Sequence, residues 1–347
     1  MAPSTVLVTG ASRFIGGQLA ARLASDPSID RVLGMDVAPP NPELRRQLGR
    51  TEFVRADLRS PLIARVISSA RVDTVVHTSL SAHPPDSLRG HYSTLPQTNV
   101  IGTMQLLAAC QRAATVTRLI VKSTAAVYGA SPRDPAVFTE NDQPSGTPAS
   151  GYARDIGEIE GYVRGFARRR EDVAVTVVRF SNVIGPRIQT PLTRYLSLPV
   201  VPTVLGRDER LQLLHEEDAL AVLERAVRER LPGVFNAAGS GVLLLSQAIR
   251  RAGRIPLALP SPAITALGWL VRGTGLGGSC PEPAGLLHIG RVMDTTRLRT
   301  VFGFEPRWTT LQAFDDWVRG QAVRPVCDPQ WLVAAERKVL ALAAQLR

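Results

Sequence analysis

The side chains with the clearest chemical potential lie in the stretch SGYARDIGE, from Ser150 to Glu158. A tyrosine phenol can exchange a proton with a substrate hydroxyl, more readily when a neighbouring cation lowers its pKa. A lysine four residues after the tyrosine on a helix lies on the same face and supplies that cation. In this sequence Tyr152 is followed at that position by Ile156. The stretch therefore holds a candidate acid/base without the expected cationic partner.

A second candidate site lies near the start of the chain, where VLVTGASRFIGGQLAARL has the pattern of a strand, a glycine turn and a helix. The first amides of such a helix can bind a pyrophosphate. Gly10 permits the tight turn, and Gly16 lets the helix pack against the strand. Asp36 ends the next strand, and its carboxylate suits ribose hydroxyls and repels a 2′-phosphate, which favours NAD over NADP. The alternative is an ordinary turn followed by two solvated aspartates, Asp36 and Asp57.

The elements that would position these residues alternate strand and helix through the first half of the chain. Several strand-like runs are continuously apolar, as in a parallel sheet buried on both faces. Between them, NVIGTMQLLAACQR and GYARDIGEIEGYVRGF have apolar residues at helical spacing. The expected strands are TVLVTG, RVLGMD, TEFVRAD, DTVVHTS, TRLIVKST and VAVTVVRF. This order predicts the α/β class, with a Rossmann-type doubly wound parallel sheet.

The pattern changes after Phe180, where proline and glycine interrupt the chain. We expect residues 1–180 to form a dinucleotide-binding domain, with residues 213–240 returning to it. Residues 181–330 are expected to form a smaller, interleaved substrate lobe. The tail, residues 331–347, has apolar side chains on one helical face. It is predicted to be an amphipathic helix that docks on the body or on a second subunit rather than on a membrane.

Composition narrows the class of protein further. The 347 residues are 44% hydrophobic, enough for a large core, and no apolar run reaches the length of a membrane span. The start of the chain lacks a signal-peptide pattern, so a cytoplasmic protein without membrane contact is expected. Cys110, Cys280 and Cys327 are far apart, and the histidines have no metal-ligand spacing, so no metal site is predicted.

The net charge of +11 comes almost entirely from arginine, because Lys122 and Lys338 are the two lysines in the sequence. A basic protein can bind nucleic acid, but the sequence has no basic block interleaved with aromatic residues and no helix-turn-helix signal. The charge therefore indicates an attraction for phosphorylated small molecules rather than for nucleic acid.

Seven motifs make the chain resemble the extended short-chain dehydrogenase/reductase family, and within it the NAD-dependent epimerase/dehydratase group that includes sugar-nucleotide 4-epimerases. TGASRFIG resembles the family's TGxxGxxG turn, and NVIGTMQLL resembles NVxGTxNLL. STAAVYG resembles SSxxVYG, and RFSNVIGP resembles RxxNVYGP. ADL, DTVVHTS and LLHEEDAL resemble further segments of the family. The resemblance covers most of the chain.

The resemblance implies a role for each matching position. The implied cofactor-binding residues are Gly10, Arg13, Phe14, Ile15, Gly16, Asp36, Asp57, Leu58, Thr78, Ser79, Asn99 and Ser181. Asn182 matches a position that faces substrate, Thr124 matches the hydroxyl that orients the substrate oxygen, and Tyr152 matches the acid/base. His77 matches a structural histidine. The family also implies a nucleotide-sugar substrate and a homodimer formed through the helices after the fourth and fifth strands.

Arg13 departs from the family pattern, because it stands where the middle glycine of the turn lets the pyrophosphate approach closely. Its side chain could reach over the phosphates, favour NADP, or crowd the turn and weaken dinucleotide binding. Asp36 argues against NADP. We therefore expect an NAD site that is retained in modified form.

The second departure is Ile156 at the lysine position. An unperturbed tyrosine has a pKa of about 10, so about one phenol in a thousand is ionised at neutral pH. A cation lowers such a pKa by about 1–3 units, so its loss costs on the order of ten- to a thousandfold in rate if the phenolate reacts. Lys122, two residues before Thr124 on the same side of the strand, is our candidate for a replacement cation. The alternative is a lysine that only extends to solvent at the strand end.

Three functions remain open from the sequence. The first is an NAD-dependent epimerase or dehydratase that acts on a nucleotide sugar, or a related hydroxylated metabolite, by hydride transfer at a hydroxyl-bearing carbon. The second is a dinucleotide-binding regulatory protein that has lost redox turnover, consistent with Ile156 and Arg13. The third is a redox-neutral enzyme that uses Tyr152 as an acid/base.

Overall fold

The computed structural model describes residues 4–80, 97–129, 134–143, 151–260, 262–263 and 290–321. The chain divides into two compact units, which are described separately. The first comprises Met1–Ser181, Glu217–Ala237 and Met293–Glu305, and the second comprises Asn182–Glu216, Ala238–Val292 and Pro306–Arg347. The helix predicted at residues 331–347 lies outside the described residues, as do Cys280 and Cys327.

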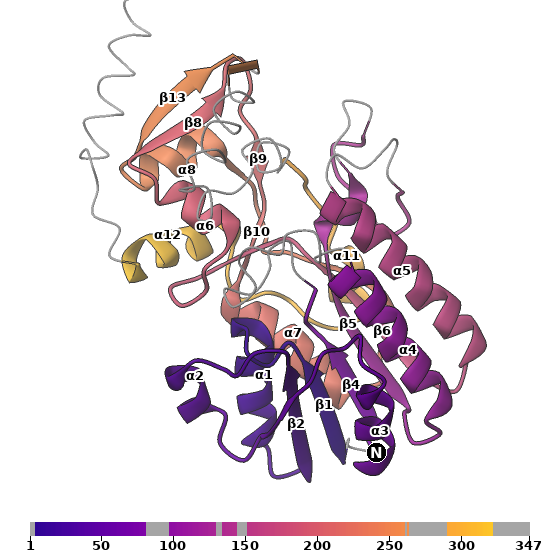
Figure 1. The fold of residues 1–347 in the computed structure, drawn as a ribbon. Coiled ribbons are helices and arrows are strands. Elements are labelled where there is room, and N and C mark those ends of the chain that lie inside the picture. Colours follow the sequence, from indigo (N-terminus) through magenta and orange to yellow (C-terminus); the bar gives the residue numbers. More distant parts are fainter. Residues whose placement is uncertain are drawn as a thin grey trace, which may run out of the picture. The chain divides into compact units, whose positions relative to one another are not determined.

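The first unit is built on a seven-stranded sheet in which every neighbouring pair of strands is parallel (Figure 1). Its strand order is β11-β6-β5-β4-β1-β2-β3. The strands are β1 (Thr5–Thr9), β2 (Arg31–Asp36), β3 (Glu52–Arg55), β4 (Thr74–His77), β5 (Arg118–Thr124), β6 (Ala174–Phe180) and β11 (Gly233–Ala237). The prediction of a Rossmann-type α/β fold is confirmed.

The central strands of this sheet are apolar because helices cover both of its faces. Every residue of β1, β4 and β6 is buried. Since the strands are parallel, their carboxyl ends meet at one edge, marked by Thr9, Asp36, His77, Thr124 and Phe180. Ligands of open α/β sheets bind outside this edge. The fold therefore brings the ends of segments far apart in the sequence to one place.

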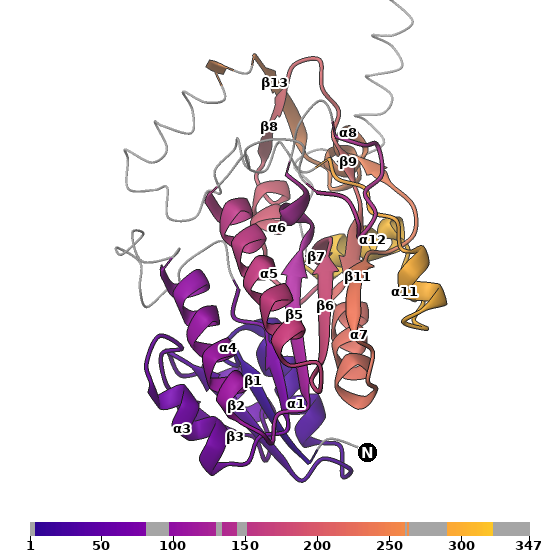
Figure 2. The same cartoon turned by 90° about the vertical axis from the view of Figure 1, so that its right-hand side faces the viewer.

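The helices of the first unit form two layers (Figure 2). One layer consists of α3 (Leu62–Ser69), α4 (Gly102–Arg112) and α5 (Gly151–Arg169), which lie side by side. The other contains α1 (Phe14–Ala24) and α7 (Glu216–Arg228), where Arg22 forms ion pairs with Glu217 and Glu224. The shorter elements are α2 (Pro42–Gln47), α11 (Thr296–Thr300), the π-helical turn η3 (Gln97–Ile101) and the 3-10 turn η4 (Ala125–Tyr128).

The second unit consists of short strand pairs and helices around its own core. Two pairs are parallel: β7 (Asn182–Ile184) with β10 (Leu213–His215), and β8 (Val200–Val204) with β13 (Ile255–Leu259). The antiparallel pair is β9 (Arg210–Leu211) with β12 (Leu243–Leu244), and the helices are α6 (Pro191–Leu196), α8 (Leu245–Arg251) and α12 (Thr310–Gly320). Leu213, Ile249, Phe314 and Trp317 are among its buried core residues.

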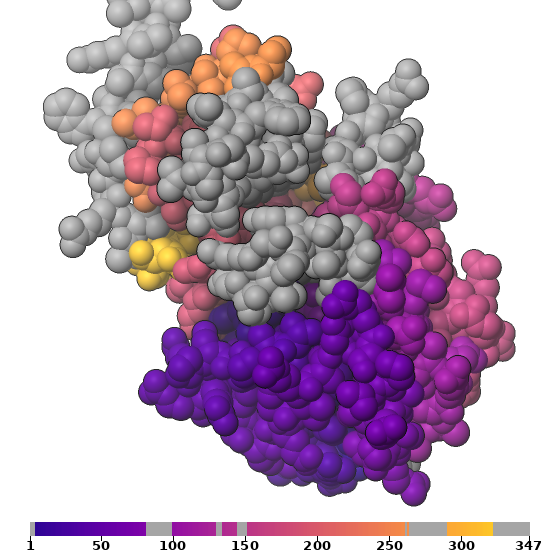
Figure 3. Space-filling model, in the orientation of Figure 1, coloured from indigo at the N-terminus to yellow at the C-terminus, as the bar shows by residue number. Residues whose placement is uncertain are grey.

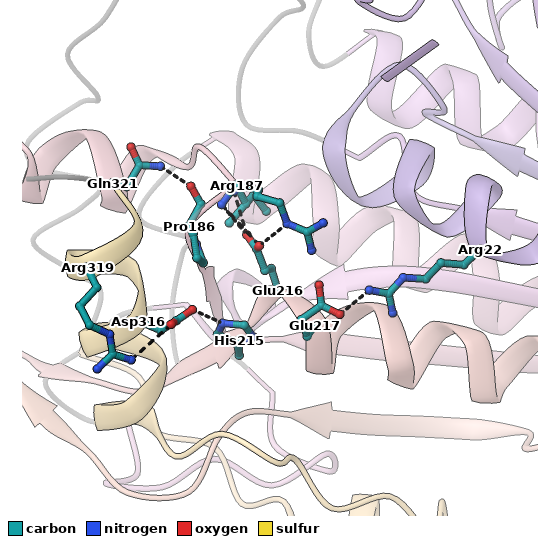
Figure 4. A network of polar contacts seen from close by, with 10 residues as sticks. Arg22, Pro186, Arg187, His215, Glu216, Glu217, Asp316, Arg319 and Gln321 are labelled. Carbon is teal, nitrogen blue, oxygen red and sulfur yellow. Dashed lines mark hydrogen bonds and ion pairs between the residues drawn. The ribbon is translucent and has the colours of Figure 1, made fainter. Parts of the chain in front are cut away.

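The segment around His215 contributes to the packing of the second unit (Figure 4). Nε2 of His215 lies 3.2 Å from Oδ2 of Asp316, and the imidazole stacks on Trp308 with 4.2 Å between ring centroids. The buried Glu216 carboxylate accepts hydrogen bonds from the backbone N–H (3.1 Å) and Nε (2.9 Å) of Arg187. In the second unit, His215 therefore joins β10 to α12, and Glu216 binds Arg187, which follows β7.

Candidate functional site

The turn between β1 and α1 requires its two flanking glycines. Gly10 has φ +77°, and a β-carbon there would lie 2.9 Å from the Cα of Ser79. A β-carbon on Gly16 would lie 2.3 Å from the carbonyl oxygen of Gly10 and 2.6 Å from Oγ1 of Thr78. Thr78 itself donates a hydrogen bond to the carbonyl of Thr9, at 2.6 Å. The predicted cofactor residues Gly10, Gly16, Thr78 and Ser79 therefore lie together at the carboxyl edge.

Asp36 lies at the same edge, where β2 ends. Its Oδ2 accepts the Ser12 N–H at 3.1 Å, and its Oδ1 accepts the Val37 N–H at 2.8 Å. Burial raises the pKa of this carboxyl group, while the Arg13 charge opposes the rise. Because each carboxylate oxygen has more than one acceptor site, Asp36 can still accept from ribose hydroxyls.

Asp57 and Leu58, at the end of β3, have partners of their own in the structure. The Asp57 carboxylate forms an ion pair with Arg59 at 2.6 Å, and hydrogen bonds from Arg59 lower its pKa. Leu58 is buried, and its Cβ lies 3.2 Å from the position of a β-carbon built on Gly102, at the start of α4. Both residues follow the carboxyl end of β3.

The carboxyl end of β5 presents alternate residues to opposite faces of the sheet. Ser123 points toward α5, where it donates a hydrogen bond to Glu160 at 2.6 Å. Lys122 and Thr124 point to the other face, and both are half-buried. Lys122 forms no hydrogen bond or ion pair with any residue that the structure describes. Burial and the nearby charge of Arg13 lower the pKa of Lys122 to about 8.

Tyr152 lies in the first turn of α5 and is half-buried. Ile156, one helical turn later, is 0% exposed, and Asp155 is also buried. Burial raises the pKa of the Tyr152 phenol, the Arg13 charge opposes that rise, and the Asp155 charge adds to it. In the described ranges, the charges that act on Tyr152 therefore come from Arg13 and Asp155, and Lys122 is not among them.

A buried polar network holds α5 against the sheet. Oε2 of Glu160 and Nη2 of Arg179 form an ion pair at 2.6 Å. Nη1 of Arg179 also donates to the Tyr128 hydroxyl at 2.9 Å, which in turn donates to Oδ1 of Asn236 at 2.6 Å. With Ser123, this network joins α5 to β5, β6 and β11, and so sets the position of Tyr152. Arg179 was not among the residues predicted from the sequence, although a charged residue in the apolar run VAVTVVRF indicates a buried partner.

Arg13 is the N-cap residue of α1, and its side chain makes no capping hydrogen bond. Its backbone N–H donates to the carbonyl of Gly10 at 3.1 Å. The side chain is half-buried and forms no hydrogen bond or direct ion pair within the described part of the chain. Burial lowers the pKa of Arg13, and the charges of Asp36 and Tyr152 oppose that effect. The charge of Arg13 therefore acts on Asp36 and on the candidate acid/base Tyr152.

His77 lies between two threonine hydroxyls beneath this edge. Nδ1 of His77 is 2.8 Å from Oγ1 of Thr9, and Nε2 is 3.0 Å from Oγ1 of Thr103. Burial and the Lys122 charge lower the pKa of His77 to about 3, so the imidazole is neutral at physiological pH. Thr103 donates to the carbonyl of Asn99 at 2.6 Å, which places the buried Asn99 beside β4.

The remaining predicted residues lie at the ends of elements. Phe14 and Ile15 begin α1. Ser181 follows β6, its backbone N–H donates to Ala237 at 3.0 Å, and its buried Oγ has no partner among the described residues. Asn182 belongs to the second unit, where it begins β7.

Two other kinds of feature are absent from the described residues. No group of three or more His, Cys, Asp or Glu side chains in these residues could hold a metal ion. No helix within the same ranges is long and apolar enough to cross a membrane.

Comparison with known proteins places this geometry in context. The sequence model of the NAD-dependent epimerase/dehydratase family matches residues 6–238. The uncharacterized protein Rv0501 of Mycobacterium tuberculosis is 50% identical over 341 residues, covering 98% of this chain and 90% of that protein.

Two solved structures show the same fold. The dTDP-glucose 4,6-dehydratase of Bacillus anthracis, in complex with NAD, has a TM-score of 0.70 at 18% identity and covers 92% of this chain and 97% of its own. The UDP-glucose 4-epimerase of Thermotoga maritima, with UDP-glucose, has a TM-score of 0.68 at 20% identity and covers 91% and 98%.

Proposed function

Because the chain belongs to the NAD-dependent epimerase/dehydratase family, we propose that it is an NAD-dependent enzyme that acts on a nucleotide sugar. The reaction begins with oxidation at a hydroxyl-bearing carbon of the sugar and passes through a transient ketone. The main support for this proposal is the position of the candidate residues in the first unit. There Tyr152 and Thr124 share the carboxyl end of one parallel sheet with the glycine turn and Asp36.

The residues at this edge fit NAD. Ser181 has a buried hydroxyl oxygen without a partner in the described ranges, as expected of a group that bonds a ligand. Asp36 would accept hydrogen bonds from ribose hydroxyls, and its charge disfavours the 2′-phosphate of NADP. The turn from Gly10 to Gly16 would hold the pyrophosphate. Bound NAD would supply the chemistry of accepting a hydride from the sugar carbon and returning it.

The side chains of the chain itself would move the proton. The phenolate oxygen of Tyr152 would take the proton of the sugar hydroxyl as the C–H bond at the same carbon breaks, and would return it when the ketone is reduced. Thr124 would orient the sugar oxygen. Its Oγ1 lies 3.4 Å from the N–H of Ala126, a long contact that leaves the hydroxyl able to bond a substrate.

A nucleoside diphosphate sugar is the substrate class that the comparisons support. The two similar solved enzymes are named for a dTDP-sugar and a UDP-sugar. The net charge of +11 favours an anionic ligand of this kind.

The test is a panel of UDP- and dTDP-sugars incubated with the NAD-loaded protein, with products resolved by chromatography and mass spectrometry. We expect a change of configuration or a loss of water in at least one sugar, and no change with Tyr152→Phe. Turnover that is equal in wild type and Tyr152→Phe contradicts the proposed role of the tyrosine.

A second candidate function is a dinucleotide-binding protein without redox turnover. It is favoured by the buried Ile156 at the lysine position and by the raised pKa of Tyr152. Such a protein retains NAD but converts no sugar in the panel.

We also infer a homodimer formed through α4 and α5. Exposed apolar or aromatic side chains mark this layer, with Ile101 and Met104 each 42% exposed and Tyr162 37% exposed. Figure 3 shows both helical segments at the surface in that view, in purple and pink. Light scattering after size exclusion should give twice the mass of one 37.5 kDa chain, and a single-chain mass contradicts the inference.

A further inference from the structure

Tyr128 is a buried aromatic residue that follows Thr124 by one 3-10 turn. Thr124 is the N-cap residue of η4, and Tyr128 is the last residue of that turn. Tyr128 is 0% exposed, and its ring stacks on Phe138 with 4.7 Å between the ring centroids. The contacts of Tyr128 therefore determine where the turn that begins at Thr124 ends.

The hydroxyl group of Tyr128 has a defined donor and a defined acceptor. Nη1 of Arg179 donates to the Tyr128 oxygen at 2.9 Å, so the single hydroxyl proton goes to Oδ1 of Asn236, at 2.6 Å. Nδ2 of Asn236 donates to the carbonyl oxygens of Phe138 (3.3 Å) and Asp294 (3.2 Å), which sets the orientation of the amide. Because this phenol is buried and its proton is committed to Asn236, Tyr128 is unsuited to exchange a proton with a substrate.

The guanidinium of Arg179 holds a second element through its other nitrogens. Nε donates to Oε1 of Glu160 at 3.0 Å and Nη2 donates to Oε2 at 2.6 Å, which is a bidentate arrangement. Glu160 lies eight residues after Tyr152 on α5, about two helical turns. Arg179 itself belongs to β6, which lies between β5 and β11 in the sheet (Figure 2). One buried cation therefore binds both the end of the turn that begins at Thr124 and the helix that carries Tyr152.

The local contacts of Thr124 do not fix its hydroxyl group. Thr124 is the last residue of β5, and in the register of the sheet it pairs with Phe180 at the end of β6. Among the described residues, its side chain makes one hydrogen bond, in which Oγ1 accepts the Ala126 N–H at a long 3.4 Å. The position of this hydroxyl group thus depends on how the turn after it is held.

We propose that Tyr128 is a positioning residue whose hydroxyl group fixes the Thr124 hydroxyl relative to the Tyr152 phenol. It acts through η4, because η4 is a single tight turn with Thr124 at one end and Tyr128 at the other. The anchor is the guanidinium of Arg179, which also holds α5. The inference deepens the proposed function and rests on it for its catalytic meaning, since Thr124 and Tyr152 would bind the same sugar oxygen.

A buried tyrosine with satisfied hydrogen bonds can also serve stability alone. The two roles differ in what the loss of the hydroxyl group changes. A purely stabilising hydroxyl changes the free energy of unfolding and leaves the folded protein as it was. A positioning hydroxyl changes the mobility of Thr124 and the turnover of the folded protein, at temperatures well below unfolding.

The first measurement needs neither cofactor nor substrate. The threonine methyl groups of the full chain are labelled with carbon-13, and NMR relaxation gives the order parameter of each methyl axis. Thr124→Ser identifies the Thr124 resonance. We expect Tyr128→Phe to lower the order parameter of the Thr124 methyl group. The methyl group of Thr176, which is buried in β6, should keep its order parameter and serves as the control.

The second measurement is the turnover of a sugar that the wild-type protein converts. A small misplacement of a reacting group costs up to about a hundredfold in rate, so we expect kcat of Tyr128→Phe to fall by about ten- to a hundredfold. The affinity for NAD should not change. Tyr195→Phe is the matched control, because it removes a buried hydroxyl group of the second unit that donates to the Pro202 carbonyl at 2.5 Å. Its kcat should equal that of wild type.

A second variant keeps the test open if Tyr128→Phe does not fold. Asn236→Ala removes the acceptor of the same proton and leaves the phenol in place. It should lower both the order parameter of the Thr124 methyl group and kcat, in the same direction as Tyr128→Phe.

An unchanged order parameter of Thr124 in these variants overturns the inference, whether or not any sugar is converted. A mobile Thr124 with the kcat of wild type also overturns it, because the placement of Thr124 is then without consequence. A mobile Thr124 in Tyr128→Phe, in a protein whose wild type converts no sugar, rejects the proposed enzyme and supports the anchoring of Thr124 by Tyr128.

Discussion

Glu160 and Arg179 form an ion pair that is almost wholly buried, with side chains 2% and 6% exposed and 2.6 Å between Oε2 and Nη2. The pair joins α5 to β6, and Ser123 joins the same carboxylate to β5 at 2.6 Å. Because Tyr152 lies two turns before Glu160 on the same helix, this pair determines where the phenol lies relative to Thr124. The stability of the unit and the geometry of the candidate site thus depend on the same contact.

Removing the Glu160 carboxylate should destabilise the first unit strongly. Glu160→Ala leaves the Arg179 guanidinium buried without its counter-ion, which costs about 3–5 kcal/mol. Glu158→Ala, on the exposed side of the same helix, should change the free energy of unfolding by less than about 0.5 kcal/mol. Denaturant unfolding of both variants measures the difference, and equal stabilities contradict the structural role of the pair.

Tyr152→Phe should abolish turnover without loss of NAD affinity. Positioned acid/base groups contribute about 10²–10⁴-fold in rate, so kcat should fall by that factor or more. Tyr162→Phe is the matched control, because Tyr162 is an exposed tyrosine on the same helix whose hydroxyl donates to Glu158 at 2.9 Å. Loss of NAD binding in Tyr152→Phe is inconsistent with a role limited to proton transfer.

Lys122→Met should stabilise the protein at neutral pH. Burial holds the pKa of Lys122 at about 8 in the folded state, below its ordinary value of 10.5, so the fold disfavours the charged form. The unfolded chain then binds more protons between pH 8 and 10.5, and wild-type stability rises with pH through that window. The gain from Lys122→Met should be about 1–3 kcal/mol at neutral pH and should vanish above the window.

Among the described residues, the charged and titratable groups that interact electrostatically with Lys122 are Arg13 and His77. His77 is neutral throughout this window, because its pKa is held at about 3, and Arg13 stays charged. Thermal unfolding of wild type and Lys122→Met, on both sides of the window, isolates the lysine. A pH-independent difference between the two proteins contradicts the assigned titration.

Asp36→Ala should change the cofactor preference. Hydrogen bonds to a charged group contribute about 1.5–3 kcal/mol, so NAD affinity should fall by about ten- to a hundredfold while repulsion of NADP is lost. Asp30→Ala, which removes an exposed carboxylate just before β2, is the control for net charge. Calorimetric titrations with both dinucleotides measure the ratio, and an unchanged ratio contradicts the ribose contact.

The sheet and the glycine turn could be predicted because their signals are local. Apolar runs such as TVLVT and AVTVVRF are the observed strands β1 and β6, and Gly10 is needed for its positive φ. The ion pair of Glu160 with Arg179 could not be predicted, because its members lie on different elements. Residues 293–305 were expected in the substrate lobe but lie in the first unit.

The charged group that acts on Tyr152 could not be predicted from the sequence for the same reason. The alternation of β5 puts Lys122 and Thr124 on the same side of the strand, but alternation does not say which charge reaches the phenol. That depends on which elements lie beside the first turn of α5 in the folded protein, and among the described residues the charges that act on the phenol are those of Arg13 and Asp155.

The most direct measurement of the central claim is the cofactor content of the native protein. Protein purified without added dinucleotide is denatured, the released small molecules are analysed by mass spectrometry, and the cofactor-depleted protein is titrated with NAD and NADP. We predict released NAD, or saturable binding of NAD that is tighter than that of NADP. No released NAD and no binding at millimolar NAD would contradict an NAD-dependent enzyme.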